Sequence, residues 1–222
     1  EGVEIPVVHG PFLLIMRRVL GSNPVEKAVR SLDLAGELGA DTMIVHPPFR
    51  WQTHFHHWLL EEAAVFEEDA DCVVGVENLY PVKAGGRRVR FHRYTDPEHL
   101  LPFRNTVLDT SHFAVSGVDI RTAWQRLRAT ANHLHVSDNR GHGHDSHAPL
   151  GHGVLPIGAF LNTVGADERW DGAITLELDC RRYLDNRAAL VGYLRQERIK
   201  ARDLLDGASS MEVLGRADDV AA

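Results

Sequence analysis

The chain has few cysteines and no long apolar run. Its two cysteines among 222 residues, Cys72 and Cys180, lie far apart and outside any CxxC spacing. A disulfide framework is therefore not expected, and a reducing cytoplasm is the expected location. No apolar stretch approaches the roughly 20 residues that a membrane-spanning helix needs, so we expect no membrane association.

The chain also lacks an excess of positive charge. It has 24 Lys and Arg against 31 Asp and Glu, with a net charge of -7. Nonspecific nucleic-acid binding depends on positive side chains that neutralise phosphates, so this negative net charge disfavours a nucleic-acid partner. A local basic groove is the alternative that would still allow one. The length and a hydrophobic content of 44% suit one domain with a full core. A homo-oligomer is compatible with the sequence.

Six short apolar runs rich in β-branched residues alternate with helix-like segments. The runs have strand length and are nearly continuous, which is typical of strands covered on both faces. Asn23, Pro24 and Gly39 supply the start and stop signals of the first helix. The predicted strands are 3–9, 41–46, 72–77, 105–109, 133–136 and 173–177, and the clearest predicted helices are 24–38, 58–70, 119–130 and 186–205.

This alternation predicts an α/β fold with a parallel sheet. Residues of metal-ligand type end every run, which favours a TIM (β/α)8 barrel over a doubly wound sheet, because every barrel strand contributes to one ring. Six strands are two short of closure. We therefore expect residues 1–205 to hold barrel strands 3 to 8, with two βα units of about 50 residues before Glu1. Residues 206–222, rich in Gly, Ser, Ala and Asp, are expected to form a flexible tail.

Two glutamates, Glu77 and Glu177, end strongly apolar runs. A carboxylate after several buried strand residues carries a heavy desolvation cost unless a cation compensates it. The pair therefore suggests a shared metal ion. Pairing with an arginine, or capping of a helix, is the alternative for each.

Two histidines, His9 and His46, end two further runs, each just before a turn. Asp109 and His112 close a fourth run with the spacing D-x-x-H, and His135 lies near the end of a fifth. We choose His135 over His133 because it is nearer the carboxyl end of its run. The alternatives are structural histidines at strand ends and a simple Asx turn at Asp109.

The stretch 137–153 is rich in glycine and histidine. Asp145 and His147 offer two ligands from one turn, whereas His142, His144 and His152 are expected to face solvent. Mixed histidine and carboxylate sites accept zinc, manganese, magnesium or cobalt, so a divalent metal ion is the expected cofactor.

A basic segment, 83–94, follows the run that ends in Glu77. Its Arg87, Arg88 and Arg90 are candidates for binding a phosphate. The alternative is a solvated hairpin without a ligand.

Taken in order, the motifs resemble the xylose isomerase-like barrel superfamily, which includes sugar phosphate isomerases and epimerases together with endonuclease IV of AP endonuclease family 2. The resemblance covers His9 to about Asp179. It does not select a subfamily. The motifs that carry it are VHGP, VHPP, GVEN, LDTSH, HLHVSDNRG, DSHAPLGHG and LELD.

Resemblance to the isomerase and epimerase members implies one metal ion, held by Glu77, Asp109, His135 and Glu177, with His112 binding substrate. The metal would polarise an open-chain sugar, while the catalytic Glu77 and Glu177 take and return a proton through an enediolate. The expected partner is then a small sugar or sugar phosphate. We favour this interpretation because the chain is acidic and its connecting loops are short.

Resemblance to endonuclease IV implies instead a cluster of three metal ions that activates a hydroxide for attack on a phosphodiester. The chain has a residue of the right type at every position, with Glu77 as the natural bridge. A barrel that has lost catalysis is a third alternative, disfavoured by the intact glutamate pair. The nine positions are His9, His46, Glu77, Asp109, His112, His135, Asp145, His147 and Glu177.

Overall fold

The structure is a computed structural model that describes residues 2–11, 19–84 and 87–215. The chain forms two compact units. Unit 1 contains Glu1–Leu108 and Arg126–His133, and unit 2 contains Asp109–Gln125 and Leu134–Ala222. We describe each unit by itself.

Six parallel strands form one sheet in the order β1-β2-β3-β6-β7-β8, which is the architecture of a partial TIM barrel. The predicted α/β class and all six predicted strands are thus confirmed. Unit 1 contains β1 to β3 and the first residues of β6 and β7, and unit 2 contains the rest. The strands are β1 (Val7–His9), β2 (Thr42–Val45), β3 (Val73–Glu77), β6 (Thr106–Asp109), β7 (Ala131–Val136) and β8 (Ala173–Leu176).

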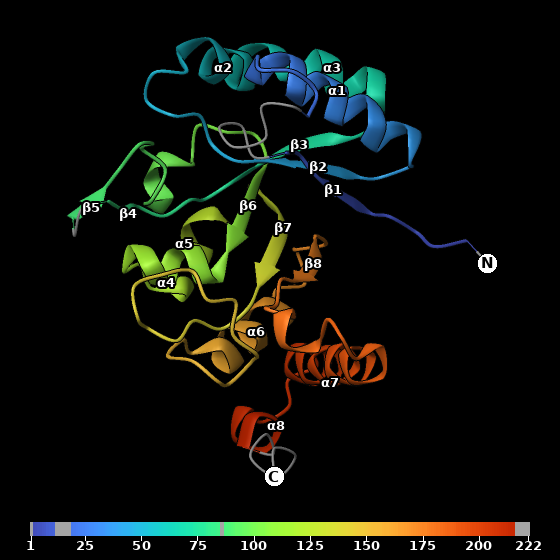
Figure 1. Cartoon of the computed structure of the whole chain (residues 1–222), viewed down its shortest axis with the longest axis vertical. Helices are drawn as coiled ribbons and strands as arrows, with labels where there is room; N and C mark the ends of the chain where they lie inside the picture. The colour runs from blue at the N-terminus through green and yellow to red at the C-terminus, as the bar shows by residue number, and fades with distance from the viewer. Residues whose placement is uncertain (1, 12–18, 85–86, 216–222) are drawn as a thin grey trace. The chain divides into compact units, whose positions relative to one another are not determined.

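In unit 1, helices cover one face of β1 to β3 (Figure 1). The Asn23 side chain accepts a hydrogen bond from the Val25 N–H at 3.0 Å and caps the first helix, as the sequence predicts. The helix predicted at 58–70 begins earlier, at Thr53, and passes through a π-helical turn. The helices are α1 (Pro24–Glu37), α2 (Thr53–His57), η1 (Trp58–Glu62) and α3 (Ala63–Ala70).

The core of unit 1 lies between these helices and the sheet. All four residues of β2 are buried, as expected for a strand covered on both faces. Phe55 and Trp58 are fully buried, and their rings stack with centroids 6.0 Å apart. The early start of this helical segment follows from that packing, since Phe55 must reach the core.

A separate antiparallel hairpin, β4 (Val82–Ala84) and β5 (Arg87–Val89), follows β3. This matches the hairpin alternative for the basic segment. Its turn residues, 85 and 86, lie outside the described residues. A short 3-10 helix, η2 (Pro97–His99), comes before β6.

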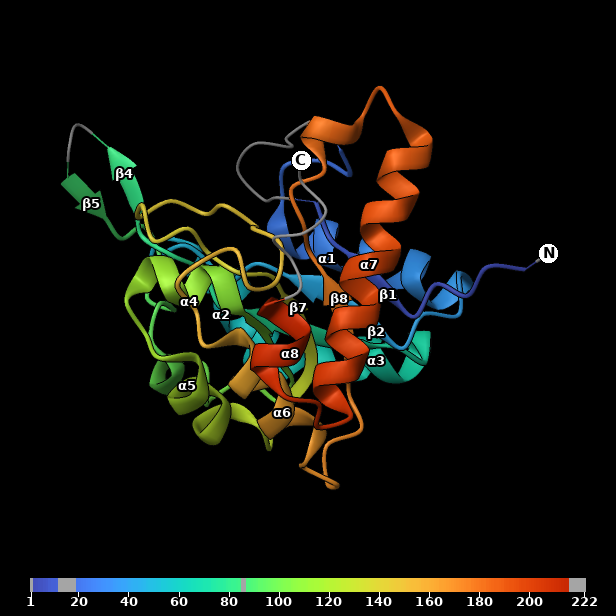
Figure 2. The ribbon, with the colours of Figure 1, turned by 90° about the horizontal axis from the view of Figure 1, so that it is seen from below.

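In unit 2, Figure 2 shows α6, α7 and α8 side by side. The Asn162 side chain of α6 donates to the Ala208 carbonyl at 3.2 Å, which ties α6 to the loop between α7 and α8. The elements are α4 (Thr110–Ser116), α5 (Ile120–Leu127), whose last residues fall in unit 1, α6 (Ile157–Gly165), η3 (Arg181–Tyr183), α7 (Arg187–Leu205) and α8 (Ser210–Leu214).

The described residues include helices that the sequence analysis did not predict. The α4 segment consists mainly of residues with low helix propensity, but Asp109 caps it by accepting from the His112 N–H at 2.7 Å. The α8 helix lies in the segment predicted as a flexible tail: residues 210–214 are helical, and the flexibility of the segment stays a prediction. The reason for the helix is the burial of Val213, which gives it an apolar anchor. Residues 216–222 lie outside the described residues.

Among the described residues, no helix combines the length and apolar character needed to cross a bilayer. Both cysteines are free, and burial raises the pKa of Cys72 to about 11. This agrees with a thiol that is unreactive near neutral pH.

Replacing Gly36 by Ala should destabilise the protein, because the new Cβ would lie 2.5 Å from the Ala70 carbonyl oxygen. We expect a loss of about 1–3 kcal/mol in the free energy of unfolding, measured in urea. Gly192→Ala on α7 is the matched control. Its Cβ meets nothing within 4 Å, and alanine should stabilise the helix by about 0.5–1 kcal/mol. Equal effects of the two substitutions would contradict this account of the packing.

Candidate metal centres

The ligand-type residues lie at or just beyond the carboxyl ends of the parallel strands. His9, Glu77 and Asp109 are the last residues of β1, β3 and β6, while His46 and Glu177 directly follow β2 and β8. Parallel strands bring their carboxyl ends to one edge of a sheet, where the sites of α/β enzymes lie. The remaining positions are His135 on β7, His112 on α4, and Asp145 and His147 in the loop after β7.

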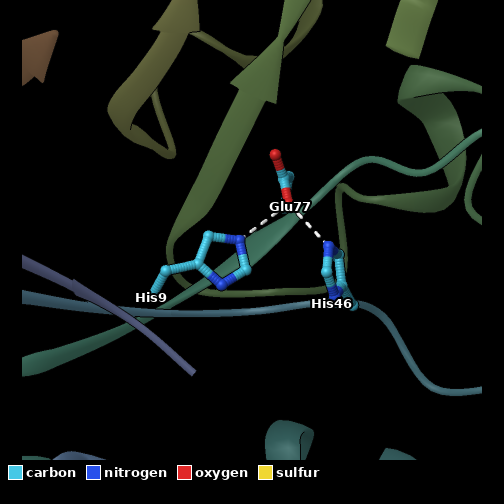
Figure 3. Close-up of side chains that lie close together, drawn as sticks. All are labelled: His9, His46 and Glu77. Atoms are coloured by element: carbon cyan, nitrogen blue, oxygen red, sulfur yellow. Dashed lines mark hydrogen bonds and ion pairs between the residues drawn. The ribbon is translucent and has the colours of Figure 1, made fainter. Parts of the chain in front are cut away.

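Unit 1 brings His9, His46 and Glu77 together (Figure 3). The Nε2 atoms of both histidines lie 3.3 Å from Oε2 of Glu77. The two imidazole centroids are 4.9 Å apart. Glu77 is only 1% exposed, so its carboxylate is shielded from water and has the two imidazoles as neighbours. We call this group the first ligand set.

The register of the sheet explains the first ligand set. His9 pairs with Ile44 on β2, and Val45 pairs with Val76 on β3, so the three strands end at similar heights. The Gly10 N–H donates to the Ile44 carbonyl at 2.8 Å and fixes the turn after His9. Three ligands at three neighbouring strand ends therefore converge without any long loop.

Unit 2 brings His112, Asp145 and His147 together as a second ligand set. Oδ2 of Asp145 lies 3.4 Å from Nε2 of His112 and 2.7 Å from Nε2 of His147. Ser111 donates a hydrogen bond to the other oxygen of Asp145, and Asn139 donates to Ser111 at 2.9 Å. The Asp145 carboxylate is thus held from both sides.

A third ligand set in unit 2 consists of Asp109, His135 and Glu177, which offer ligand atoms within 4.8 Å of one another. Nδ1 of His135 lies 3.0 Å from Oε2 of Glu177 and 3.9 Å from Oδ2 of Asp109. Asp109 is fully buried, whereas the Glu177 side chain is 42% exposed. Glu177 is therefore the more accessible of the two carboxylates.

In the second ligand set, hydrogen bonds from the imidazoles stabilise the negative charge of the Asp145 carboxylate. Burial alone would raise the pKa of Asp145, but bonds from His112 and His147 outweigh it and hold that pKa below its usual range. Burial alone would lower the pKa of His147, but Asp145 and the nearby charges of Asp109 and Glu177 raise it. The buried anions thus draw positive charge toward them, and a divalent cation supplies such charge.

The backbone at His147 has φ +38°, in the left-handed region that residues with a side chain rarely adopt. Such a conformation costs of order 1–3 kcal/mol and persists only where the surrounding structure imposes it. Ser137 Oγ lies 3.3 Å from His147 Nδ1, and the His147 carbonyl accepts from the Asp179 N–H at 2.9 Å. The loop is therefore held in a conformation that brings His147 to Asp145.

Donor type and spacing in all three sets fit divalent metal ions. Each set combines imidazole nitrogen with carboxylate oxygen, the mixture that zinc and manganese accept. That Glu77 also belongs with Asp109, His135 and Glu177 is implied by the resemblance and stays a prediction.

The arginines named as candidate phosphate ligands show no such convergence. Arg87 and Arg90 are exposed, and the side chain of Arg88 lies outside the described residues. The histidines expected to face solvent, His142, His144 and His152, are all exposed.

The residues that position the candidate metal ligands were not predicted from the sequence. Ser111 and Asn139 are buried and orient Asp145, but nothing in their spacing marks them as partners. Asp138 accepts from the N–H groups of Gly153 and Leu155 at 3.0 Å and closes the ligand-bearing loop. Burial raises its pKa despite these bonds. The only sequence signal was the run SDN after β7.

Comparison with known proteins identifies the family. The model of a family described as xylose isomerase-like TIM barrel matches residues 1–197. The chain belongs to this family. Uncharacterised proteins of Mycobacterium leprae and Mycobacterium tuberculosis are each 34% identical to it, with matches covering 79% of this chain and 70% of the relative.

Solved structures of xylose isomerase-like barrels share the fold. The 3-keto-D-glucoside 4-epimerase of Escherichia coli has a TM-score of 0.61 at 16% identity, covering 89% of this chain and 80% of that one. A D-tagatose 3-epimerase-like protein has a TM-score of 0.57 at 22% identity, covering 87% and 78%. Endonuclease IV of Thermus thermophilus has a TM-score of 0.48 at 23% identity, covering 86% and 76%. The likenesses to the two epimerase structures concern the fold alone.

The loop that carries the second ligand set is anchored on α7. Glu197, 2% exposed, accepts from the Leu150 N–H at 2.8 Å and from Lys200 Nζ at 2.7 Å. Leu150 lies three residues after His147. The buried Glu197–Lys200 ion pair on α7 thus fixes the position of the loop just after His147.

Replacing Glu197 by Ala should destabilise the protein by about 3–5 kcal/mol, because it leaves Lys200 buried without its partner and removes the acceptor of Leu150. Chemical denaturation measures the loss. Asp203→Ala, which removes an exposed carboxylate from the same helix, should change stability by less than about 0.5 kcal/mol. Wild-type stability in Glu197→Ala would show that the pair is not an anchor.

Proposed function

We propose that this chain is a metal-dependent hydrolase of a phosphate ester that uses metal ions at all three ligand sets. The observation that carries the proposal is the presence of two ligand sets beyond the one that a single-metal enzyme needs. They are His9, His46 and Glu77 in unit 1, and His112, Asp145 and His147 in unit 2.

A single-metal isomerase leaves four of these residues without a role. It uses Glu77, Asp109, His135 and Glu177 for the metal and His112 for the substrate, as the resemblance implies. Yet His46 lies 3.3 Å from Glu77, and His147 lies 2.7 Å from Asp145 with a strained backbone. Strain and buried charge are retained where function requires them, which supports a role for the extra residues.

Divalent ions in these sets would neutralise phosphate charge and make water a better nucleophile near neutral pH. The chain's own residues then orient and move protons. Glu77 is held between two imidazoles, and Glu177 is exposed enough to take a proton from the attacking water. We propose these two glutamates as the catalytic residues.

The proposed substrate is a small phosphate ester, such as a sugar phosphate or a short phosphodiester, rather than long duplex DNA. A net charge of -7 opposes the counterion release that drives binding to long polyanions. A small ester needs only a few local positive charges beside the metal ions.

A sugar isomerase or epimerase is the second candidate, and one observation favours it. The third ligand set combines the fully buried Asp109 with the accessible Glu177, and His135 lies beside both carboxylates. One metal ion and one accessible carboxylate suffice for proton transfer through an enediolate. The two candidates differ in their need for His46 and His147.

Activity assays on His46→Ala and His147→Ala distinguish the two candidates. With zinc, manganese, magnesium or cobalt supplied, we expect wild-type protein to hydrolyse bis(p-nitrophenyl) phosphate, and each variant to lose about 100-fold or more in kcat/KM. His152→Ala, an exposed histidine of the same loop, should retain activity. An abasic-site duplex tests whether DNA is also a substrate.

The same three variants are assayed for ketose epimerisation by NMR. Epimerisation by the wild type that survives in His46→Ala and His147→Ala, with no phosphodiester hydrolysis in any protein, would reject the hydrolase and support the isomerase. Glu177→Gln should abolish either activity, and full turnover in that variant would reject the catalytic assignment.

A further inference from the structure

A pocket of about 110 Å³ in unit 1 lies between two loops that follow strands ending in candidate ligands. One wall comes from the loop after His46 and the other from the chain that returns from the β4–β5 hairpin. Six of its lining residues are Phe49, Arg50, Gln52, His56, Arg93 and Tyr94. We call it the arginine pocket.

Backbone hydrogen bonds fix the two walls of the arginine pocket. The Arg50 N–H donates to the Phe91 carbonyl at 2.9 Å, and Phe49 forms an antiparallel bridge with His92. Leu79, two residues after Glu77, donates its N–H to the Tyr94 carbonyl at 3.1 Å. The pocket is thus tied by backbone to the strand ends that carry His46 and Glu77.

The polar groups that line the arginine pocket are mainly donors. Arg50 and Arg93 bring two guanidinium groups, and among the described residues neither forms an ion pair within 4 Å. Gln52 uses its amide oxygen to accept from the Phe49 N–H at 2.8 Å, so its NH2 group is the part left to donate. No carboxylate lines the pocket. Two positive charges without a counter-charge favour an anion.

The floor of the arginine pocket is aromatic. Phe49 and Tyr94 are buried, and the His56 and Tyr94 rings have centroids 6.1 Å apart. Burial raises the pKa of Tyr94 although Arg93 lowers it, so the phenol stays a donor at neutral pH. The combination suits a phosphate group joined to a flat or apolar moiety.

We propose that the arginine pocket binds a phosphate group of the substrate that is not the reacting one, through Arg50 and Arg93. This inference rests on the proposed function and narrows it: the substrate would carry a second phosphate beside the hydrolysed ester. Arg50 and Arg93 then set specificity, whereas Arg87, Arg88 and Arg90 stay candidates from the sequence alone.

Calorimetric titration with phenylphosphonate tests the proposal on the protein with its native metal content. This dianion carries an aromatic ring and a C–P bond that hydrolysis of phosphate esters does not cleave. We expect wild-type protein to bind it, and Arg50→Ala and Arg93→Ala each to weaken binding about tenfold, the loss of one charge-assisted contact. Benzyl alcohol, its neutral counterpart, should not bind detectably.

Arg30→Ala, an exposed arginine on α1, is the matched control and should bind as the wild type does. Arg50 is exposed and Arg93 lies in the same accessible pocket, so their substitution should leave the fold intact, and circular dichroism checks this. If both pocket variants bind phenylphosphonate as tightly as the wild type does, the proposal is overturned. This holds even where the ligand binds to the metal ions. So would an equal loss in Arg30→Ala, because it would indicate a general charge effect.

The titration separates this inference from the proposed function. Arginine-dependent binding of phenylphosphonate in a protein that hydrolyses no phosphate ester would support the pocket and reject the hydrolase. Hydrolysis that is unaffected in kcat and KM by Arg50→Ala and Arg93→Ala, for a substrate with two phosphates, would reject the pocket and leave the hydrolase.

Discussion

Burial of carboxylates at the ends of parallel strands is the constraint on which the site depends. Glu77 and Asp109 are almost completely withdrawn from water, and such anions are stable only beside positive charge or strong donors. Histidines lie around both of them. A divalent ion would meet the same need with more charge, and this is the physical basis of the proposed metal-dependent activity.

That constraint also explains why the strands, and candidate ligands at their ends, could be predicted from the sequence. Continuous apolar runs identify strands covered on both faces, and a charged residue closing such a run, as Glu77 closes β3, has few structural explanations. The helices α4 and α8 were not predictable in this way. The α4 helix is stabilised by the local Asp109 cap despite its low helix propensity, and α8 by the burial of Val213, which depends on tertiary context.

The side chains that position the candidate ligands could not be predicted from the sequence either. Ser111 and Glu197 act on ligands or ligand loops from 34 and 47 residues away in the sequence, and no local pattern predicts such contacts. The arginines of the basic segment drew attention because they cluster along the chain. Arg50 and Arg93, the latter also in the basic segment, line one pocket between two loops that are joined by backbone hydrogen bonds.

The number of metal ions per chain tests the central claim most directly. Elemental analysis of natively purified protein, with the protein concentration from amino-acid analysis, should give close to three divalent ions per chain. His46→Ala and His147→Ala should each lose about one ion, because each removes a ligand from a different set. One ion per chain in the wild type, unchanged in both variants, would contradict the account and leave a single-metal isomerase.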